Sequence, residues 1–209
     1  AEDSAEVTIP SGTTFTVTGP DDFGTKTVTY GQMTDNTYDF GEVPTGSYSV
    51  TESNANVTGY GLTTSTNSPV TVDVDQPGEL VVTNKYTINT YDVTVIKTFT
   101  IDDVDKIPED FQINITIDGE VSDPLTLENG ETEDNLTYEW TLEAVPYEAL
   151  IEWAEENYEI EGFTRTETAT EGELTVSTEG NVIEVTNEYE RNTYDVTVIK
   201  TFTIDDVDK

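Results

Sequence analysis

The sequence of 209 residues contains no cysteine and no histidine. The first absence excludes disulfide bonds and thiolate metal ligands, and the second excludes imidazole bases and His-based triads. Positive charge is also scarce, because 8 Lys and Arg face 44 Asp and Glu, for a net charge of -36. Such a surface repels nucleic acid and anionic membranes, so we expect no partner of either kind.

Long apolar runs are missing as well. No stretch approaches the roughly 20 apolar residues that cross a bilayer, so we expect no membrane insertion. The start at Ala1 would suit a mature terminus after removal of a signal peptide. Thr, Val and Tyr are abundant while helix-forming runs are scarce, which favours strands.

The acidic clusters resemble calcium loops only loosely. Residues 73–75 and 102–105 lack the glycine and the terminal glutamate of an EF-hand loop. Solubility and mutual repulsion explain the charge more simply, and a saline habitat or calcium binding are the sharper alternatives. We therefore predict no metal site and no cofactor.

One segment occurs twice without change. Asn89–Lys106, with the sequence NTYDVTVIKTFTIDDVDK, recurs as residues 192–209, an offset of 103 residues from Asn89 to Asn192. Repetition at an interval of domain size predicts tandem modules. We predict module one over residues 1–88, module two over residues 89–191, and a spare first strand over residues 192–209.

The modules are unequal. Module two opens with a strand around Lys97 and closes with a strand that ends at Asn187, whereas residues 1–8 contain no counterpart of YDVTVIKTF. Residues 146–155 would also fit a short helix, with Pro146 near its first turn. Their match to residues 48–52 of module one favours a strand from about Leu150.

Apolar residues alternate with others in five segments, which is the pattern of half-buried strands. Successive side chains of a strand point to opposite faces of its sheet. Alternation therefore places polar residues on faces that should be buried: Lys97 with Tyr91 and Phe99, Asn84 with Leu80 and Tyr86, Asn187 with Ile183 and Tyr189, Glu52 with Tyr48, and Glu155 with Trp153. A buried lone charge is costly, so these residues are expected to meet one another. The plainer alternative is a snorkelling Lys and ordinary strand-end Asn residues.

The sequence at these positions resembles the Cna B-type domains of Gram-positive surface adhesins and pilins. Module one contains FGEVPTGSYSVTE over residues 40–52, Gly59-Tyr60, and VVTN over residues 81–84. Module two contains the opening strand with Lys97, Val145-Pro146, Gly162-Phe163, and EVTN over residues 184–187. It departs from the pattern between Pro146 and Glu155, where a longer segment replaces the usual Pro-x-Gly-x-Tyr turn.

The resemblance implies an all-β fold of two tandem Ig-like, prealbumin-like β-sandwiches that act as a rigid extracellular stalk on the cell surface. It also implies a spontaneous amide bond between a first-strand Lys and a last-strand Asn, promoted by an acidic residue. In module two these would be Lys97, Asn187 and Glu155. The reaction happens once per site, so the protein is not expected to be an enzyme in the turnover sense.

Module one has the Asn84 and Glu52 positions but no first-strand Lys, and the spare strand has Lys200 on its apolar face. We predict that residues 192–206 of one subunit complete module one of the next, with Lys200 bonded to Asn84 near Glu52. Such a head-to-tail contact produces an open filament of identical chains.

Other interpretations stay open at this point. The chain could be a fragment of a longer tandem array, or its repeat could have been added by engineering. The second functional class is a ligand-binding adhesin, whose partner would be a host or matrix protein or glycan. A glycosidase with paired carboxylates is the third, although a chain of this charge contains acidic pairs by chance.

Overall fold

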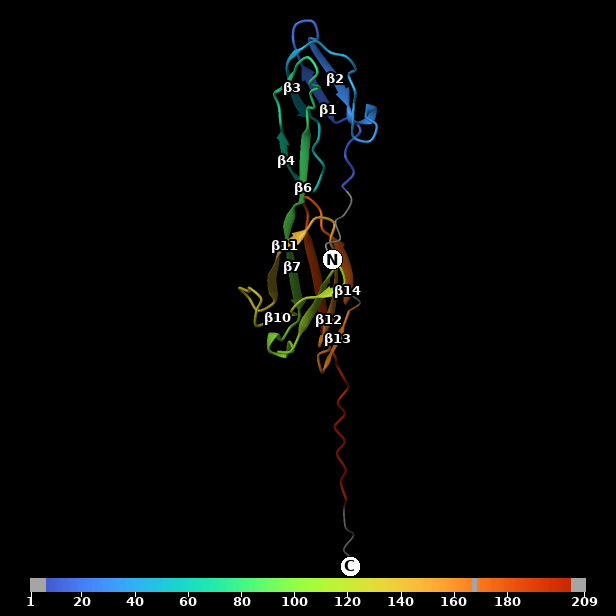
Figure 1. The fold of residues 1–209 in the computed structure, drawn as a ribbon. Coiled ribbons are helices and arrows are strands. Elements are labelled where there is room, and N and C mark those ends of the chain that lie inside the picture. Colours follow the sequence, from blue (N-terminus) through green and yellow to red (C-terminus); the bar gives the residue numbers. More distant parts are fainter. Residues whose placement is uncertain (1–6, 167–168, 204–209) are drawn as a thin grey trace, which may run out of the picture. The chain divides into compact units, whose positions relative to one another are not determined.

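The protein is built from strands in a computed structural model that describes residues 7–166 and 169–203 (Figure 1). The prediction of an all-β chain is therefore confirmed. Helical structure among the described residues consists of two short 3-10 turns, η1 (Tyr30–Gln32) and η2 (Val104–Lys106). No helix in these two ranges is long and apolar enough to cross a membrane.

Module one contains six strands: β1 (Thr14–Thr18), β2 (Thr25–Thr29), β3 (Gly46–Ser53), β4 (Tyr60–Thr66), β5 (Val70–Val72) and β6 (Val82–Ile88). Four of them form a sheet in the order β2-β1-β3-β5, and β4 pairs with β6 in a separate two-stranded sheet. The core that joins these layers is small: Val17, Phe23, Tyr48 and Val50 are its buried residues.

Module two contains nine strands: β7 (Thr90–Thr100), β8 (Gln112–Ile117), β9 (Glu120–Val121), β10 (Leu125–Thr126), β11 (Thr137–Pro146), β12 (Leu150–Glu156), β13 (Phe163–Arg165), β14 (Glu171–Thr175) and β15 (Val182–Arg191). One sheet has the order β10-β8-β12-β14, with β9 beside β8, and the other has the order β11-β7-β15-β13. In the second sheet β7 and β15 run parallel, so Lys97 lies opposite Val185 and Asn187 lies opposite Phe99.

The two modules differ most in the sheet that should contain the first strand. In module two, β7 lies between β11 and β15. In module one, β6 and β4 correspond to β15 and β13, but no described residue of module one forms a counterpart of β7 or of β11. The second sheet of module one therefore contains two strands, whereas that of module two contains four.

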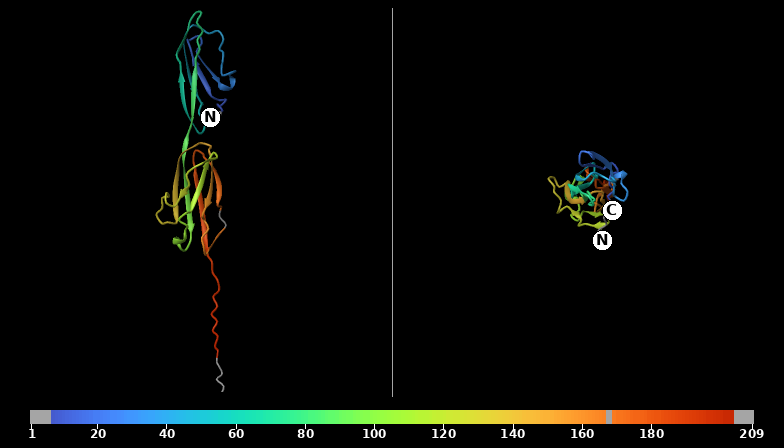
Figure 2. Two further views of the ribbon diagram at one scale, coloured as in Figure 1. Left: turned by 60° about the horizontal axis from the view of Figure 1, so that its bottom comes forward. Right: turned by 45° about the horizontal axis from the view of Figure 1, so that its top comes forward.

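Residues 193–203 follow β15 without pairing to any described strand (Figures 1 and 2). Their apolar side chains are exposed, with Val196 and Val198 at 90% and Phe202 at 80%. The same side chains in β7 are covered, with Val93 and Val95 at 0% and Phe99 at 2%. The predicted spare strand has the sequence of a core strand, but it belongs to no sheet of the described chain.

Packing divides the chain into two compact units, with the main boundary between Tyr91 and Asp92 inside β7. Two short segments, Ala144–Glu148 and Val176–Gly180, group with the first unit. The predicted boundaries of 1–88, 89–191 and 192–209 stay a prediction. The segment after Pro146 does form the expected strand, β12, which begins at Leu150.

Candidate cross-linking site

The core of module two encloses one lysine, one glutamate and one asparagine. Lys97 and Asn187 have no exposed surface and Glu155 is 6% exposed. They come from three strands: β7 holds Lys97 and the adjacent β15 holds Asn187, while β12 of the facing sheet holds Glu155. The alternation of each strand turns these side chains inward, so their predicted burial is confirmed.

Glu155 joins the other two residues. Its Oε1 atom lies 2.5 Å from Lys97 Nζ and accepts a hydrogen bond of 3.1 Å from Asn187 Nδ2. The amine of Lys97 also lies 4.8 Å from the ring centroid of Phe99. A single carboxylate oxygen thus contacts both the amine and the amide nitrogen of the predicted cross-link.

Burial changes the chemistry of this lysine. Desolvation in the core lowers the pKa of Lys97 from 10.5 to about 8, although the neighbouring Glu155 opposes that shift. A lower pKa makes the neutral amine accessible, and only the neutral amine is nucleophilic. Among the described residues, the Oε2 atom of Glu155 has no hydrogen-bond partner.

Two further residues of the site were not predicted from the sequence. The hydroxyl of Tyr189 accepts a hydrogen bond from Asn187 Nδ2 at 3.3 Å and donates one of 2.5 Å to the carbonyl of Tyr158. Arg165 approaches the amide oxygen of Asn187 at 3.5 Å. The tyrosine could have been predicted from the sequence, because each module has a Tyr two residues after its Asn, at Tyr86 and Tyr189.

We predict that a module that cannot cross-link becomes more stable as the pH rises above 8. In the variant Asn187→Ala the folded state would release the Lys97 proton from about pH 8, whereas the unfolded chain keeps it up to about 10.5. The unfolded state then binds more protons, so the free energy of unfolding rises with pH across this window. Urea unfolding between pH 7 and 10 measures the change.

The matched control is the double variant Lys97→Met with Asn187→Ala. It contains the same tyrosines, including Tyr189, whose pKa burial raises to about 12. The stability of the single variant relative to this control should increase by on the order of a few kcal/mol over the window. Identical pH profiles for the two proteins would contradict a buried amine at position 97.

Module one contains half of an equivalent site. Asn84 on β6 donates a hydrogen bond of 2.8 Å from its Nδ2 atom to Glu52 Oε1 on β3. Thr64 on β4 donates to the amide oxygen of Asn84 at 2.8 Å, and its hydroxyl also lies 3.3 Å from Glu52 Oε2. Asn84 and Glu52 are half-buried rather than buried. In module two the equivalent residues are covered by β7, and no described strand of module one takes that place.

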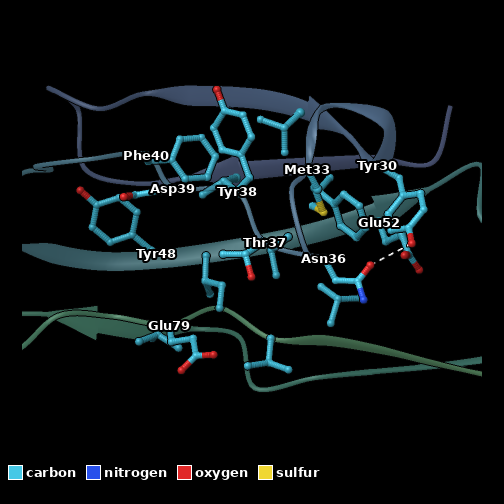
Figure 3. Close-up of a pocket in the computed structure, with 18 of the residues that line it drawn as sticks. Tyr30, Met33, Asn36, Thr37, Tyr38, Asp39, Phe40, Tyr48, Glu52 and Glu79 are labelled. Carbon is cyan, nitrogen blue, oxygen red and sulfur yellow. Dashed lines mark hydrogen bonds between the residues drawn. The ribbon is translucent and has the colours of Figure 1, made fainter. Parts of the chain in front are cut away.

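Above these residues lies an apolar groove of about 870 Å³. It lies between the β1–β3 sheet and the β4–β6 pair, and Figure 3 shows Tyr38, Phe40 and Tyr48 around this space, with Glu52 at one end. The groove is lined by apolar side chains of both layers, among them Phe15, Val17, Val50, Leu80 and Val82. An apolar groove of this size beside a half-complete sheet has the character of an unfilled strand position.

No lysine of module one can complete the half-site. Lys26 lies on the edge strand β2, with its Nζ atom 4.4 Å from the ring centroid of Phe23, and Lys85 lies on β6 beside Asn84. Both lysines are exposed. Lys200 lies in the unpaired segment after β15. The structure thus assembles Lys97, Glu155 and Asn187 and brings Glu52 next to Asn84. Lys200 is exposed and belongs to no strand.

No group of three or more Asp and Glu residues converges as a metal site within residues 7–166 and 169–203. Asp73 instead caps its own turn by accepting a hydrogen bond from the backbone N–H of Val74.

Most of module one matches the model of one protein family. The model of a family described as "Domain of unknown function (DUF5979)" matches residues 3–87. No curated protein matches the chain.

Several solved structures are similar over most of the chain. The major pilin protein T-13 from Streptococcus pyogenes is 14% identical, with 85% of this chain and 89% of that chain covered and a TM-score of 0.39. Another major pilin structure from Streptococcus pyogenes is 16% identical, with 85% and 89% covered and a TM-score of 0.29. A single B repeat unit of the collagen-binding surface protein Cna of Staphylococcus aureus is 18% identical, with 86% and 88% covered and a TM-score of 0.26. At these low TM-scores, the fold of this chain rests on its own strand pairings.

Proposed function

We propose that this chain is a structural subunit of an extracellular fibre, such as a pilus or adhesin stalk, and that it cross-links itself and then its neighbour. The observation that supports this most strongly is the buried set of Lys97, Glu155 and Asn187, in which one carboxylate oxygen contacts both reacting nitrogens. A fibre under load benefits from a covalent tie between the first and last strands of each module.

The proposed reaction joins Lys97 Nζ to Asn187 Cγ. Glu155 takes a proton from the lysine, and the neutral amine attacks the amide carbon. Nζ gives up two protons in all: one passes through Glu155 to Nδ2 so that ammonia leaves, and the other is carried off with it as ammonium. The Cγ–Nδ2 bond breaks as the Cγ–Nζ bond forms. Packing holds the groups together, so the reaction needs no bimolecular encounter.

The second part of the proposal is strand donation. Residues 192–206 of one subunit enter the module-one groove of another and place Lys200 beside Asn84 and Glu52. The donor is described as far as residue 203, and residues 204–206 lie outside the described part of the chain. Its sequence is identical to that of the strand that fills the same position in module two.

This contact is heterologous: the donor segment and the acceptor groove are different surfaces of the same chain. Repeated head to tail, it extends from chain to chain into an open filament rather than a closed dimer. The cross-link at Asn84 would then make each junction covalent, by the same exchange of an amine for ammonia.

Intact mass spectrometry after boiling in denaturant tests the intramolecular bond. Each chain should be lighter than its sequence mass by one ammonia, and the loss should disappear in Glu155→Gln, which removes the proton acceptor but keeps the size of the side chain. An unmodified mass for the wild-type protein would contradict the cross-link and leave a non-covalent stalk.

A further inference from the structure

The module-one groove has a second wall that corresponds to a strand of module two. Residues 35–40 have the sequence DNTYDF, and residues 134–140 have the related sequence DNLTYEW with one additional residue. Asn36 and Asn135 both have positive φ angles, of 60° and 56°. A left-handed asparagine therefore precedes both Tyr38 and Tyr138, although in module one Asp35 is left-handed as well.

In module two this segment is a strand. Residues 137–146 form β11, which is hydrogen-bonded beside β7. The backbone N–H of Phe99 donates to the carbonyl of Leu136 at 2.8 Å, and the Phe99 and Tyr138 ring centroids are 6.2 Å apart. Tyr138 is 7% exposed as a result.

In module one the same residues have no strand to pair with. Residues 38–41 adopt no regular structure, and Tyr38 is 40% exposed. Its ring contacts Phe40 at 5.0 Å between centroids, and Figure 3 shows both side chains on the β1–β3 side of the groove. The residue that would cover it, a counterpart of Phe99, is missing from module one.

We infer that residues 37–40 are the second strand partner of the donated segment, and that Tyr38 receives Phe202 of the neighbouring subunit. This inference rests on the proposed strand donation and adds to it a second hydrogen-bonded edge. The completed sheet would have the order 37–40, donor, β6, β4, which matches β11-β7-β15-β13 of module two.

The aromatic pair would also set the register. Phe202 follows Lys200 by two residues, as Phe99 follows Lys97, so both lie on one face of the strand. A slip of one residue would turn Lys200 away from Asn84 and Glu52. Seating Phe202 on Tyr38 therefore places Lys200 for the cross-link, which makes Tyr38 a positioning residue.

A double-mutant cycle tests the contact. The acceptor is the full chain with Val196→Asp and Val198→Asp, which disables its own donor, and the probe is a peptide of residues 192–206 with Lys200→Ala, which binds without cross-linking. Tyr38→Ala in the acceptor and Phe202→Ala in the peptide should each weaken binding. Their combined effect should fall short of the product by roughly three- to tenfold.

The matched control pairs Tyr38→Ala with Val196→Ala in the peptide. Val196 is six residues from Phe202, or roughly 20 Å along a strand, so these two changes should multiply independently. Peptide binding should also slow hydrogen exchange of the amides in residues 38–40.

The outcomes are separable. If the peptide binds but the Tyr38 and Phe202 changes multiply independently and residues 38–40 gain no protection, the second edge is wrong while strand donation stands. If the peptide with its native apolar face does not bind at all, strand donation and the second edge are both overturned.

Discussion

Lys97→Met is expected to lower the thermal midpoint of module two by on the order of 20 °C. The cross-link connects residues that are roughly 90 positions apart. In the chain-entropy model, closing a loop of that size contributes about 4–5 kcal/mol. For a domain of about 100 residues, each kcal/mol shifts the midpoint by about 4–8 °C. Calorimetry measures the shift, and the mass of the same sample reports whether the bond has formed.

Lys106→Met is the matched control, because Lys106 is exposed in η2 of the same module and the substitution makes the same chemical change outside the core. It should move the midpoint by little. Glu155→Gln should be at least as destabilising as Lys97→Met, since it removes the bond and also leaves a buried amine without its counter-charge. A Lys97→Met protein with an unchanged midpoint would contradict the structural role of the cross-link.

Lys200→Ala is expected to abolish multimers that survive boiling in SDS, while multimers in native buffer remain. The substitution removes the amine that attacks Asn84 but leaves the apolar side chains that fill the groove. Val198→Asp should abolish both kinds of multimer, because it would bury an unpaired carboxylate where the equivalent Val95 is 0% exposed. Gel electrophoresis with and without boiling separates the two effects.

Thr203→Asp adds the same charge at a harmless position. Its counterpart Thr100 ends β7 and is exposed, so the variant should assemble like the wild type. The net charge of -36 makes the ionic strength important, and assembly is best measured near physiological salt, where repulsion between subunits is screened. Assembly of Val198→Asp at wild-type levels would contradict burial of the donor strand.

Alternation in the sequence was sufficient to predict the buried faces. Lys97, Glu155 and Asn187 were placed inward because strand side chains alternate with a period of two, and each is buried. The same pattern, together with the repeat, identified β12 despite the helix-like composition after Pro146. A strand can be identified in this way when a second copy of the module in the same sequence shows which residues correspond to it.

The bounds of the strands and the neighbours of each side chain depend on which strands pair with one another. The sequence of a single segment does not show its pairing partners. The alternation over residues 80–86 predicts a strand there, but β6 begins at Val82, where the pairing with Thr66 of β4 begins. Residues 194–202 have the sequence of β7 yet form no strand, because they pair with no other strand of the described chain, whereas β7 lies between β11 and β15. Arg165 reaches Asn187 because β13 pairs with β15, and Thr64 reaches Asn84 because β4 pairs with β6.

The central claim is that Lys200 of one subunit bonds to Asn84 of another, and isotope mixing tests it most directly. Equal amounts of unlabelled and ¹⁵N-labelled chain are mixed before assembly, and the boiled multimers are digested and analysed by mass spectrometry. The account predicts a branched peptide that joins Lys200 to Asn84, with one labelled and one unlabelled arm in a substantial share of the copies. Branched peptides whose two arms always share one label would show closure within a single chain, and absence of the branched peptide would contradict the covalent junction.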